Sequence, residues 1–93
     1  MKRMDAELHR LSEAFLEERE SFWGFHEEFI KRWTRLAPGA LSDADRKRWN
    51  EIYFWILTSV PDPVSAEDHA RGTIGEAELR SRLRGHPLLA SPR

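Results

Sequence analysis

Aromatic side chains recur at helical spacing in the first half of this chain, and this pattern constrains the fold more than any other feature. They follow one another every three or four residues, so a helix would gather them on one face. The run consists of Phe22, Phe25, Phe29 and Trp33. The chain has 93 residues and no cysteine, so neither disulfides nor thiolate-bound metals can supplement its core. Large rings must fill a small interior, and we predict a single all-α domain.

Four segments have the apolar spacing of amphipathic helices, and they predict a four-helix bundle. The segments are residues 4–20, 21–37, 42–60 and 74–84. The first two could form one continuous helix, but Ser21 is a suitable N-cap and Gly24 weakens a helix by about 1 kcal/mol. We therefore favour two helices with a break near Glu20. We expect the domain to span residues 1–84 and residues 85–93 to be a mobile C-terminal tail.

Capping residues and a long loop separate the later segments. Ser42 is a suitable N-cap for the third helix. Residues 61–72 are polar and rich in turn formers, and a loop of this length is often functional. Thr73 and Glu76 have the spacing of a capping box, which we expect to open the last helix.

Charge is nearly balanced overall but alternates along the chain. The net charge of −1 argues against a protein that binds nucleic acid through a general excess of positive charge. Four consecutive blocks, residues 1–30, 31–48, 49–79 and 80–93, carry −4, +4, −5 and +4. Such alternation favours neighbouring helices that pair their charges, although it would also give a partner separate acidic and basic patches.

Hydropathy gives no sign of a membrane segment. No apolar run approaches the ~20 residues that span a bilayer, and the first residues lack the apolar stretch of a signal peptide. The absence of cysteine fits a reducing compartment. We therefore expect a soluble protein of the cytoplasm.

Motifs for catalysis or metal binding are not apparent. The four histidines are scattered, and none has the spacing of a metal-ligand pair. No serine stands in a nucleophile motif, and the glycines form no run that would cradle a phosphate. We predict a non-enzymatic protein without a metal or cofactor. His26 lies among aromatic residues, and we expect it to donate to a backbone group rather than act as a general base.

Two basic clusters would contact phosphates if they converged on one surface. They are Lys31-Arg32-x-x-Arg35 and Arg46-Lys47-Arg48, with Trp33 and Trp49 interleaved. Compensation of helix ends and pairing with acidic neighbours is the interpretation we favour. Direct nucleic-acid binding is therefore not expected.

Two aromatic residues of the third helix fall outside its main apolar face. Trp49, Ile52 and Ile56 define that face, and Phe54 and Trp55 point elsewhere, about 100° apart. We expect at least one of the two to be exposed. An exposed ring beside the long loop would be a suitable anchor for a partner, because interface hot spots favour aromatic residues.

Four features follow one another in a familiar order over roughly residues 8–84. They are a short amphipathic helix, a Phe-x-x-x-Phe-x-x-x-Trp helix, an Asp-Pro loop, and an Ile-Gly-Glu-x-x-Leu-Arg segment. The residues concerned are Leu8 to Leu16; Phe25, Phe29 and Trp33; Asp62-Pro63; and Ile74-Gly75-Glu76 with Leu79-Arg80. This order resembles that of the small helical immunity proteins of the colicin-D type.

The resemblance implies an inhibitor that binds and blocks the nuclease domain of a cognate bacterial toxin, often a tRNA-cleaving one. In that family, acidic groups are offered to the basic, RNA-binding site of the toxin. The candidate acids here are Asp62, Glu67, Asp68, Glu76 and Glu78. Phe54 or Trp55 would add apolar contact area.

A second interpretation belongs to another class of protein. The chain would be a helical adaptor or regulatory subunit of a larger assembly, with its aromatic face as a permanent interface. A small nucleic-acid-binding regulator is a third and less favoured hypothesis. The sequence leaves the oligomeric state open.

Overall fold

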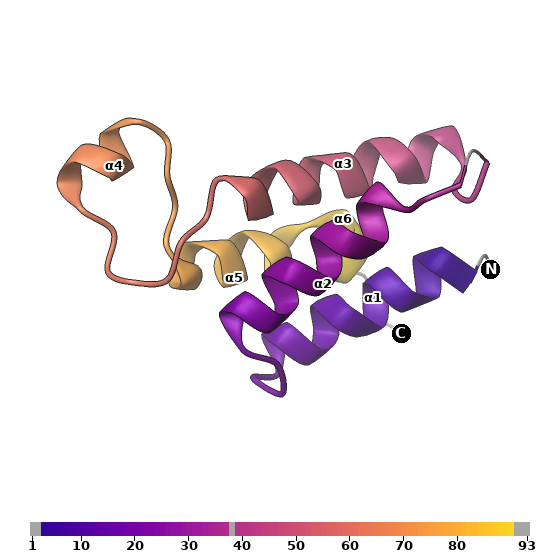
Figure 1. Ribbon diagram of the computed structural model, residues 1–93, viewed down its shortest axis with the longest axis horizontal. Coiled ribbons are helices and arrows are strands. Elements are labelled where there is room, and N and C mark those ends of the chain that lie inside the picture. Colours follow the sequence, from indigo (N-terminus) through magenta and orange to yellow (C-terminus); the bar gives the residue numbers. More distant parts are fainter. Residues whose placement is uncertain (1–2, 38, 91–93) are drawn as a thin grey trace.

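Helices account for all the regular secondary structure in the computed structural model, which describes residues 3–37 and 39–90 (Figure 1). The helices are α1 (Arg3–Leu16), α2 (Phe22–Thr34), α3 (Asp43–Leu57), α4 (Ala66–Ala70), α5 (Glu76–Gly85) and α6 (Pro87–Ala90). The all-α class predicted from the sequence is confirmed. Two short helices were not expected, because α4 lies in the long loop and α6 in the segment after Gly85. In the described part of the chain, no helix combines the length and the apolar character needed to cross a membrane.

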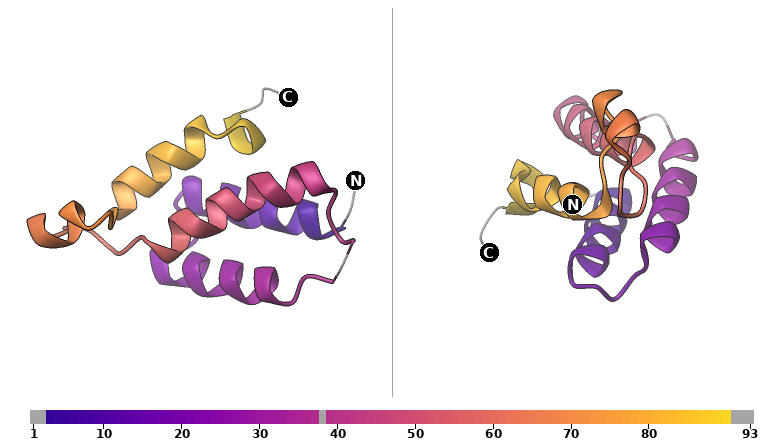
Figure 2. Two further views of the ribbon diagram at one scale, coloured as in Figure 1. Left: turned by 90° about the horizontal axis from the view of Figure 1, so that it is seen from above. Right: turned by 90° about the vertical axis from the view of Figure 1, so that its left-hand side faces the viewer.

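The four longer helices surround a common interior. α1 and α2 run antiparallel, α3 packs against α2, and α5 packs against both α1 and α3. The end-on view in Figure 2 shows these four helices arranged around a common centre, and the view from above shows α4 beyond one end. α6 lies against α5 and α1. The molecule is elongated, with principal extents of 40 × 26 × 22 Å.

Aromatic rings from three helices form the centre of the core. The ring of Phe15 stacks on that of Phe25 at 4.4 Å, and Phe29 lies 5.9 Å from Trp49. All four side chains are completely buried. The buried apolar residues of the core are Leu8, Phe15, Phe22, Phe25, Phe29, Leu41, Trp49, Ile52, Ile56, Ile74, Leu79 and Leu83. The face that carries Phe22, Phe25 and Phe29 therefore points inward, as the helical spacing predicts.

The first helix ends four residues earlier than expected, and the break between the first two helices is real. α1 stops at Leu16, and Glu18 turns the chain with a φ of 60°. Ser21 then caps α2, because its Oγ accepts a hydrogen bond from the Gly24 N–H at 3.0 Å. The prediction of two helices with a break near Glu20 is confirmed.

Arginines of α5 cover the C-terminal end of α1. The Arg80 guanidinium donates to the Phe15 carbonyl and lies 4.0 Å from the centre of the Phe15 ring. Arg84 donates to the Leu16 carbonyl at 3.3 Å. These positive groups satisfy carbonyls that have no partner within the helix and oppose the negative end of its dipole.

The last long helix begins at a different residue from the one predicted. Gly75 is its N-cap, and the Asp62 carboxylate supplies the missing side-chain acceptor by accepting from the Ala77 N–H at 2.9 Å. The prediction of a capping box at Thr73 is wrong, because hydrogen bonds with residues 58 and 60 hold Ile74 in an extended conformation. A Cβ at Gly75 would overlap the Asp62 carboxylate, so this cap requires glycine.

The segment expected to be a mobile tail contains packed residues. His86 is buried, its Nε2 lies 2.8 Å from the Glu51 carboxylate, and its Nδ1 accepts from the Leu88 N–H. Leu88 and Leu89, in α6, pack against the core. Residues 91–93 lie outside the described residues.

Candidate functional site

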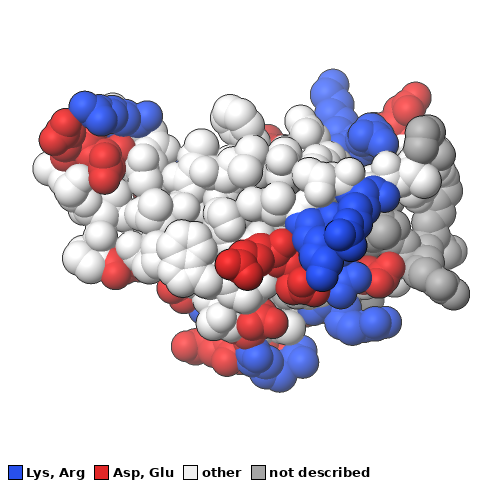
Figure 3. Space-filling view, in the orientation of Figure 1, with Lys and Arg blue, Asp and Glu red and all other residues white. Residues whose placement is uncertain are grey.

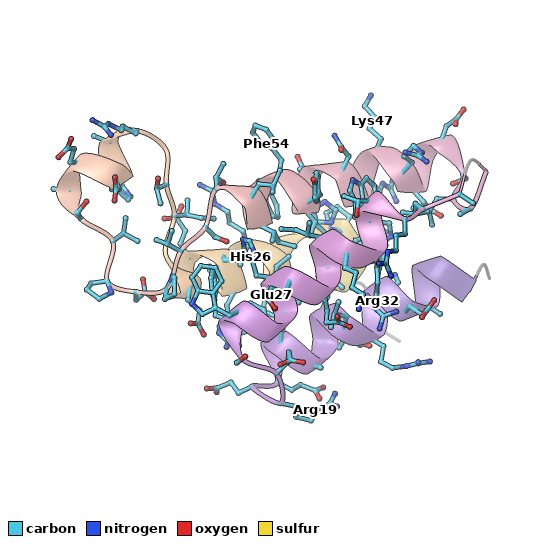
Figure 4. All side chains as sticks on the ribbon, in the orientation of Figure 1. Arg19, His26, Glu27, Arg32, Lys47 and Phe54 are labelled. Carbon is cyan, nitrogen blue, oxygen red and sulfur yellow. The ribbon has the colours of Figure 1, made fainter. Side chains whose placement is uncertain are left out.

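Three large apolar side chains of α2 and α3 remain exposed to solvent. Trp23 is 52% exposed, Phe54 is 65% exposed and Leu57 is 47% exposed. In Figure 4, Phe54 points outward from α3, and Figure 3 shows a broad uncharged area over this part of the same view. We call Trp23, Phe54 and Leu57 the aromatic face. Exposed large rings of this kind are the residues most often found as binding hot spots.

His26 lies at the centre of this area and connects α2 to α3. Its ring contacts the rings of Trp23, at 5.2 Å, and Phe22, at 5.7 Å. Partial burial lowers the pKa of His26, while a hydrogen bond with the backbone of Ile56 and the nearby Glu27 carboxylate act in the opposite direction. The neutral imidazole therefore packs as part of the surface, and the backbone contact agrees with the role expected from the sequence.

The long loop projects from one end of the molecule and is closed at its base. The Ile74 N–H donates to the Thr58 carbonyl, and the Val60 N–H donates to the Ile74 carbonyl, both at 3.0 Å. At the tip, Ser65 caps α4 by accepting from the Asp68 N–H at 3.1 Å. No residue of α4 is buried, and Figure 1 and Figure 2 show this helix projecting from the others, with His69 Nε2 3.9 Å from the Glu78 carboxylate of α5.

Most of the acidic residues proposed for partner binding have partners within the fold. Three of them pair with arginines one turn along their own helices, each at 2.7 Å: Glu67 with Arg71, Glu76 with Arg80, and Glu78 with Arg82. Asp62 caps α5, as described above. Asp68 is exposed on α4. Their negative charge is therefore largely compensated within the chain.

The two aromatic residues singled out on α3 have different surroundings. Phe54 belongs to the aromatic face, so the expectation that at least one of the pair is exposed is confirmed. Trp55 is half-buried, packs edge-on against the His86 ring at 5.5 Å and lies below the Arg82 guanidinium at 5.8 Å. Trp55 therefore helps to hold the C-terminal segment in place.

The two basic clusters approach each other at Trp33, whose ring centre lies 5.9 Å from the Arg46 guanidinium, but not all their members share one direction. Arg32 pairs with Glu7 at 2.9 Å and with Glu28 at 3.3 Å, and so faces α1. Lys47 extends from α3 in the opposite direction (Figure 4). Across residues 3–37 and 39–90, no group of three histidine, aspartate or glutamate residues is arranged to hold a metal ion.

Sequence similarity links this chain to a segment of a much larger enzyme. The similarity is to acetyl-coenzyme A synthetases. The chain is 35% identical over 71 residues to the protein of that name from Xanthomonas oryzae pv. oryzae, and 33% identical over 69 residues to that from Novosphingobium aromaticivorans. These alignments cover 75% and 73% of this chain but only 10% of each relative.

The similarity extends to other bacteria over the same length. The acetyl-coenzyme A synthetase of Aeromonas hydrophila subsp. hydrophila is 35% identical over 69 residues. No family model matches the chain, and no solved structure is detectably similar. The chain thus spans about a tenth of the length of the curated relatives it matches.

Trp23 and Leu57 were not among the residues proposed for partner binding. Trp23 adjoins the buried stripe of α2, and Leu57 lies at the edge of the α3 stripe, so spacing alone left both at a boundary between core and surface. Their exposure depends on which neighbour covers each helix. No signal in a single sequence specifies that.

Proposed function

We propose that this chain is a non-enzymatic helical domain that binds another protein through the aromatic face. The observation that supports this most directly is the exposure of Trp23, Phe54 and Leu57, whereas the other large apolar side chains that the structure describes are buried or partly buried. Burying a large apolar side chain that is exposed to water is favourable, by roughly 1.5–3 kcal/mol when the burial is complete. A partner that covers the face would gain this free energy.

The partner we favour is a larger catalytic chain, for which this domain acts as an adaptor or accessory subunit. The similarity to one tenth of the acetyl-coenzyme A synthetases supports this role, because a helical segment of that size would contact the rest of a much longer chain. An acetyl-coenzyme A synthetase from the same cell is therefore the first partner to test. In this role the four longer helices would act as a four-helix bundle that presents the aromatic face, within the cytoplasm.

The test compares binding by the wild type and by a variant with a polar face. Purified acetyl-coenzyme A synthetase of the same organism would be titrated with wild-type chain and with the double variant W23S/F54S in a calorimeter. We expect at least about a tenfold loss of affinity in the double variant, because hot-spot aromatics each contribute roughly 2 kcal/mol or more.

The controls separate loss of binding from loss of folding. The urea unfolding midpoint of W23S/F54S should stay near that of the wild type, since both rings are largely exposed. K47Q, which changes another exposed side chain of α3, should bind normally. Unchanged affinity in W23S/F54S would show that the aromatic face is not the binding surface. Failure of the wild type to bind the synthetase would show that the synthetase is not the partner.

The second candidate is the immunity protein suggested by the colicin-D-type resemblance. It is favoured by the projecting loop, which carries the exposed Glu67 and Asp68 at its tip. Here the loop would enter the basic active site of a toxin nuclease while the aromatic face supplied apolar contact. Because Asp62 and Glu76 have partners within the fold, the acids to reverse are Glu67 and Asp68.

A nuclease assay distinguishes this candidate from the adaptor. The wild type should inhibit the nuclease domain of a toxin encoded beside it, and E67K/D68K should inhibit it at least about tenfold less well. Equal inhibition by both proteins would contradict the role of the acidic loop. Absence of inhibition by the wild type would leave the adaptor as the better interpretation.

A further inference from the structure

A basic trough lies between α1 and α2, separate from the aromatic face. It consists of two depressions, of about 220 Å³ and about 270 Å³, which share Glu7 and Arg32. The basic side chains that line the two are Arg10, Arg19, Lys31, Arg32 and Arg35. We call this set the arginine trough. Figure 3 shows Lys and Arg gathering over the corresponding right-hand part of the molecule.

Positive charge in the trough exceeds what its own acids compensate. The lining includes five basic side chains but only the carboxylates of Glu7 and Glu28. Glu17, outside the trough, pairs with Arg19 at 2.6 Å. Arg10 and Arg35 form no ion pair with the side chains that the structure describes, so their guanidinium groups remain available.

Arg32 is held in a fixed position at the junction of the two depressions. Its Nη1 donates to the Glu7 carboxylate at 2.9 Å and its Nη2 donates to Glu28 at 3.3 Å. Figure 4 shows its side chain lying between α1 and α2. A guanidinium that is already oriented loses less conformational freedom when it binds an anion.

We propose that the arginine trough binds the diphosphate group of a small molecule. Guanidinium groups recognise phosphate oxygens through paired, charge-assisted hydrogen bonds, and they are preferred over lysine where such geometry matters. Arg32 lines both depressions, so an anionic group at their junction would meet its guanidinium. Leu11 and Ala14 provide an apolar floor beside them, which suits a ligand with an uncharged part attached to the diphosphate. This site is independent of the protein-binding role of the aromatic face.

Pyrophosphate is the probe for the first experiment. Backbone amide signals of the ¹⁵N-labelled protein would be followed during titration with sodium pyrophosphate, against sodium chloride at matched ionic strength. We expect saturable shifts confined to α1, the loop that carries Arg19, and the C-terminal half of α2 as far as Arg35. Shifts that do not saturate, or that match those caused by chloride, would overturn the proposal.

Substitutions in the trough identify the residues responsible. The double variant R10Q/R35Q removes two guanidinium groups that have no ion pair, so its fold should be unaffected, and pyrophosphate should bind at least about tenfold more weakly. The control variant K47Q/R48Q carries the same change of charge on α3 and should bind pyrophosphate as the wild type does. If both double variants bound pyrophosphate equally weakly, net charge alone would explain the loss, and the proposed site would be refuted.

A last measurement distinguishes a soluble ligand from a membrane or a nucleic acid. Vesicles containing anionic phospholipid and a short single-stranded RNA would each be added in place of pyrophosphate. Binding of either that pyrophosphate does not displace would overturn the assignment to a small molecule. Displacement by pyrophosphate at concentrations near its own dissociation constant would support it.

Discussion

Arg80 is the residue that joins the end of α1 to α5 most directly. Its guanidinium stacks on the Phe15 ring, donates to the Phe15 carbonyl and pairs with Glu76, and its side chain is only 14% exposed. A lysine retains the charge but has no planar group to stack and donate in three directions. This position therefore depends on shape as much as on charge.

We expect R80K to lower the free energy of unfolding by about 1–2 kcal/mol, through the loss of partly buried hydrogen bonds. R71K is the matched control, because Arg71 pairs with Glu67 four residues earlier at the surface. That change should cost less than about 0.5 kcal/mol. Urea unfolding followed by circular dichroism measures both, and equal effects of the two changes would refute the special role of Arg80.

His26 makes the stability of the fold depend on pH. Burial lowers its pKa in the folded state, so the unfolded chain binds its proton more readily. The contribution of the neutral ring is therefore fully present above the unfolded pKa of about 6.5 and is lost as pH falls towards the lower folded value.

The wild type should lose more stability between pH 7.5 and pH 5.5 than H26N, which carries no titrating ring. Thermal unfolding of both proteins at both pH values measures the loss of stability in each. The difference between the two losses is the contribution of His26, because the carboxylates titrate alike in both proteins. Parallel losses in the two proteins would show that the proton on His26 has no linkage to folding.

At the scale of single residues, helical spacing predicted burial well and exposure poorly. Phe22, Phe25 and Phe29 are buried as expected, since one stripe of a helix must face the interior. Phe54 and Trp55 could not be told apart by spacing. The difference between them arises from His86, a residue 31 positions after Trp55 that folds back onto its ring.

At the scale of elements, the sequence identified each long helix but misplaced most ends. α3 ends at Leu57 rather than at 60, because residues 58–60 pair with residue 74 instead of continuing the helix. The same pairing moves the start of α5. Short helices such as α4 contribute too few apolar positions for any periodicity to be visible.

The cap of α5 offers a direct test at this scale. D62A removes the acceptor of the Ala77 N–H and should destabilise the protein by about 1 kcal/mol. T73A removes the hydroxyl of the capping box expected from the sequence and should have almost no effect. Chemical unfolding of the two variants measures the difference, and a larger loss in T73A would restore the original assignment.

At the scale of the whole molecule, the alternating charge blocks pair more within helices than between them. Arg32 with Glu7 joins the first two blocks across α1 and α2, but the acids of the third block pair mainly with arginines of their own helices. Composition therefore predicted the balance of charge, and helical spacing predicted the all-α class. It could not predict where the acids would be compensated, because that depends on spacing of four residues within each helix.

The contact between Arg80 and Phe15 spans 65 positions of the chain, so it cannot form until α5 has been synthesised. α1 meets α2, and α2 meets α3, over short sequence distances, so we expect these contacts to form early. Leu79 and Leu83, which complete the core, lie on α5. During synthesis from the N-terminus, the aromatic interior therefore stays open on one side until α5 has emerged, and this is the interval in which misfolding or capture by a chaperone is most favoured.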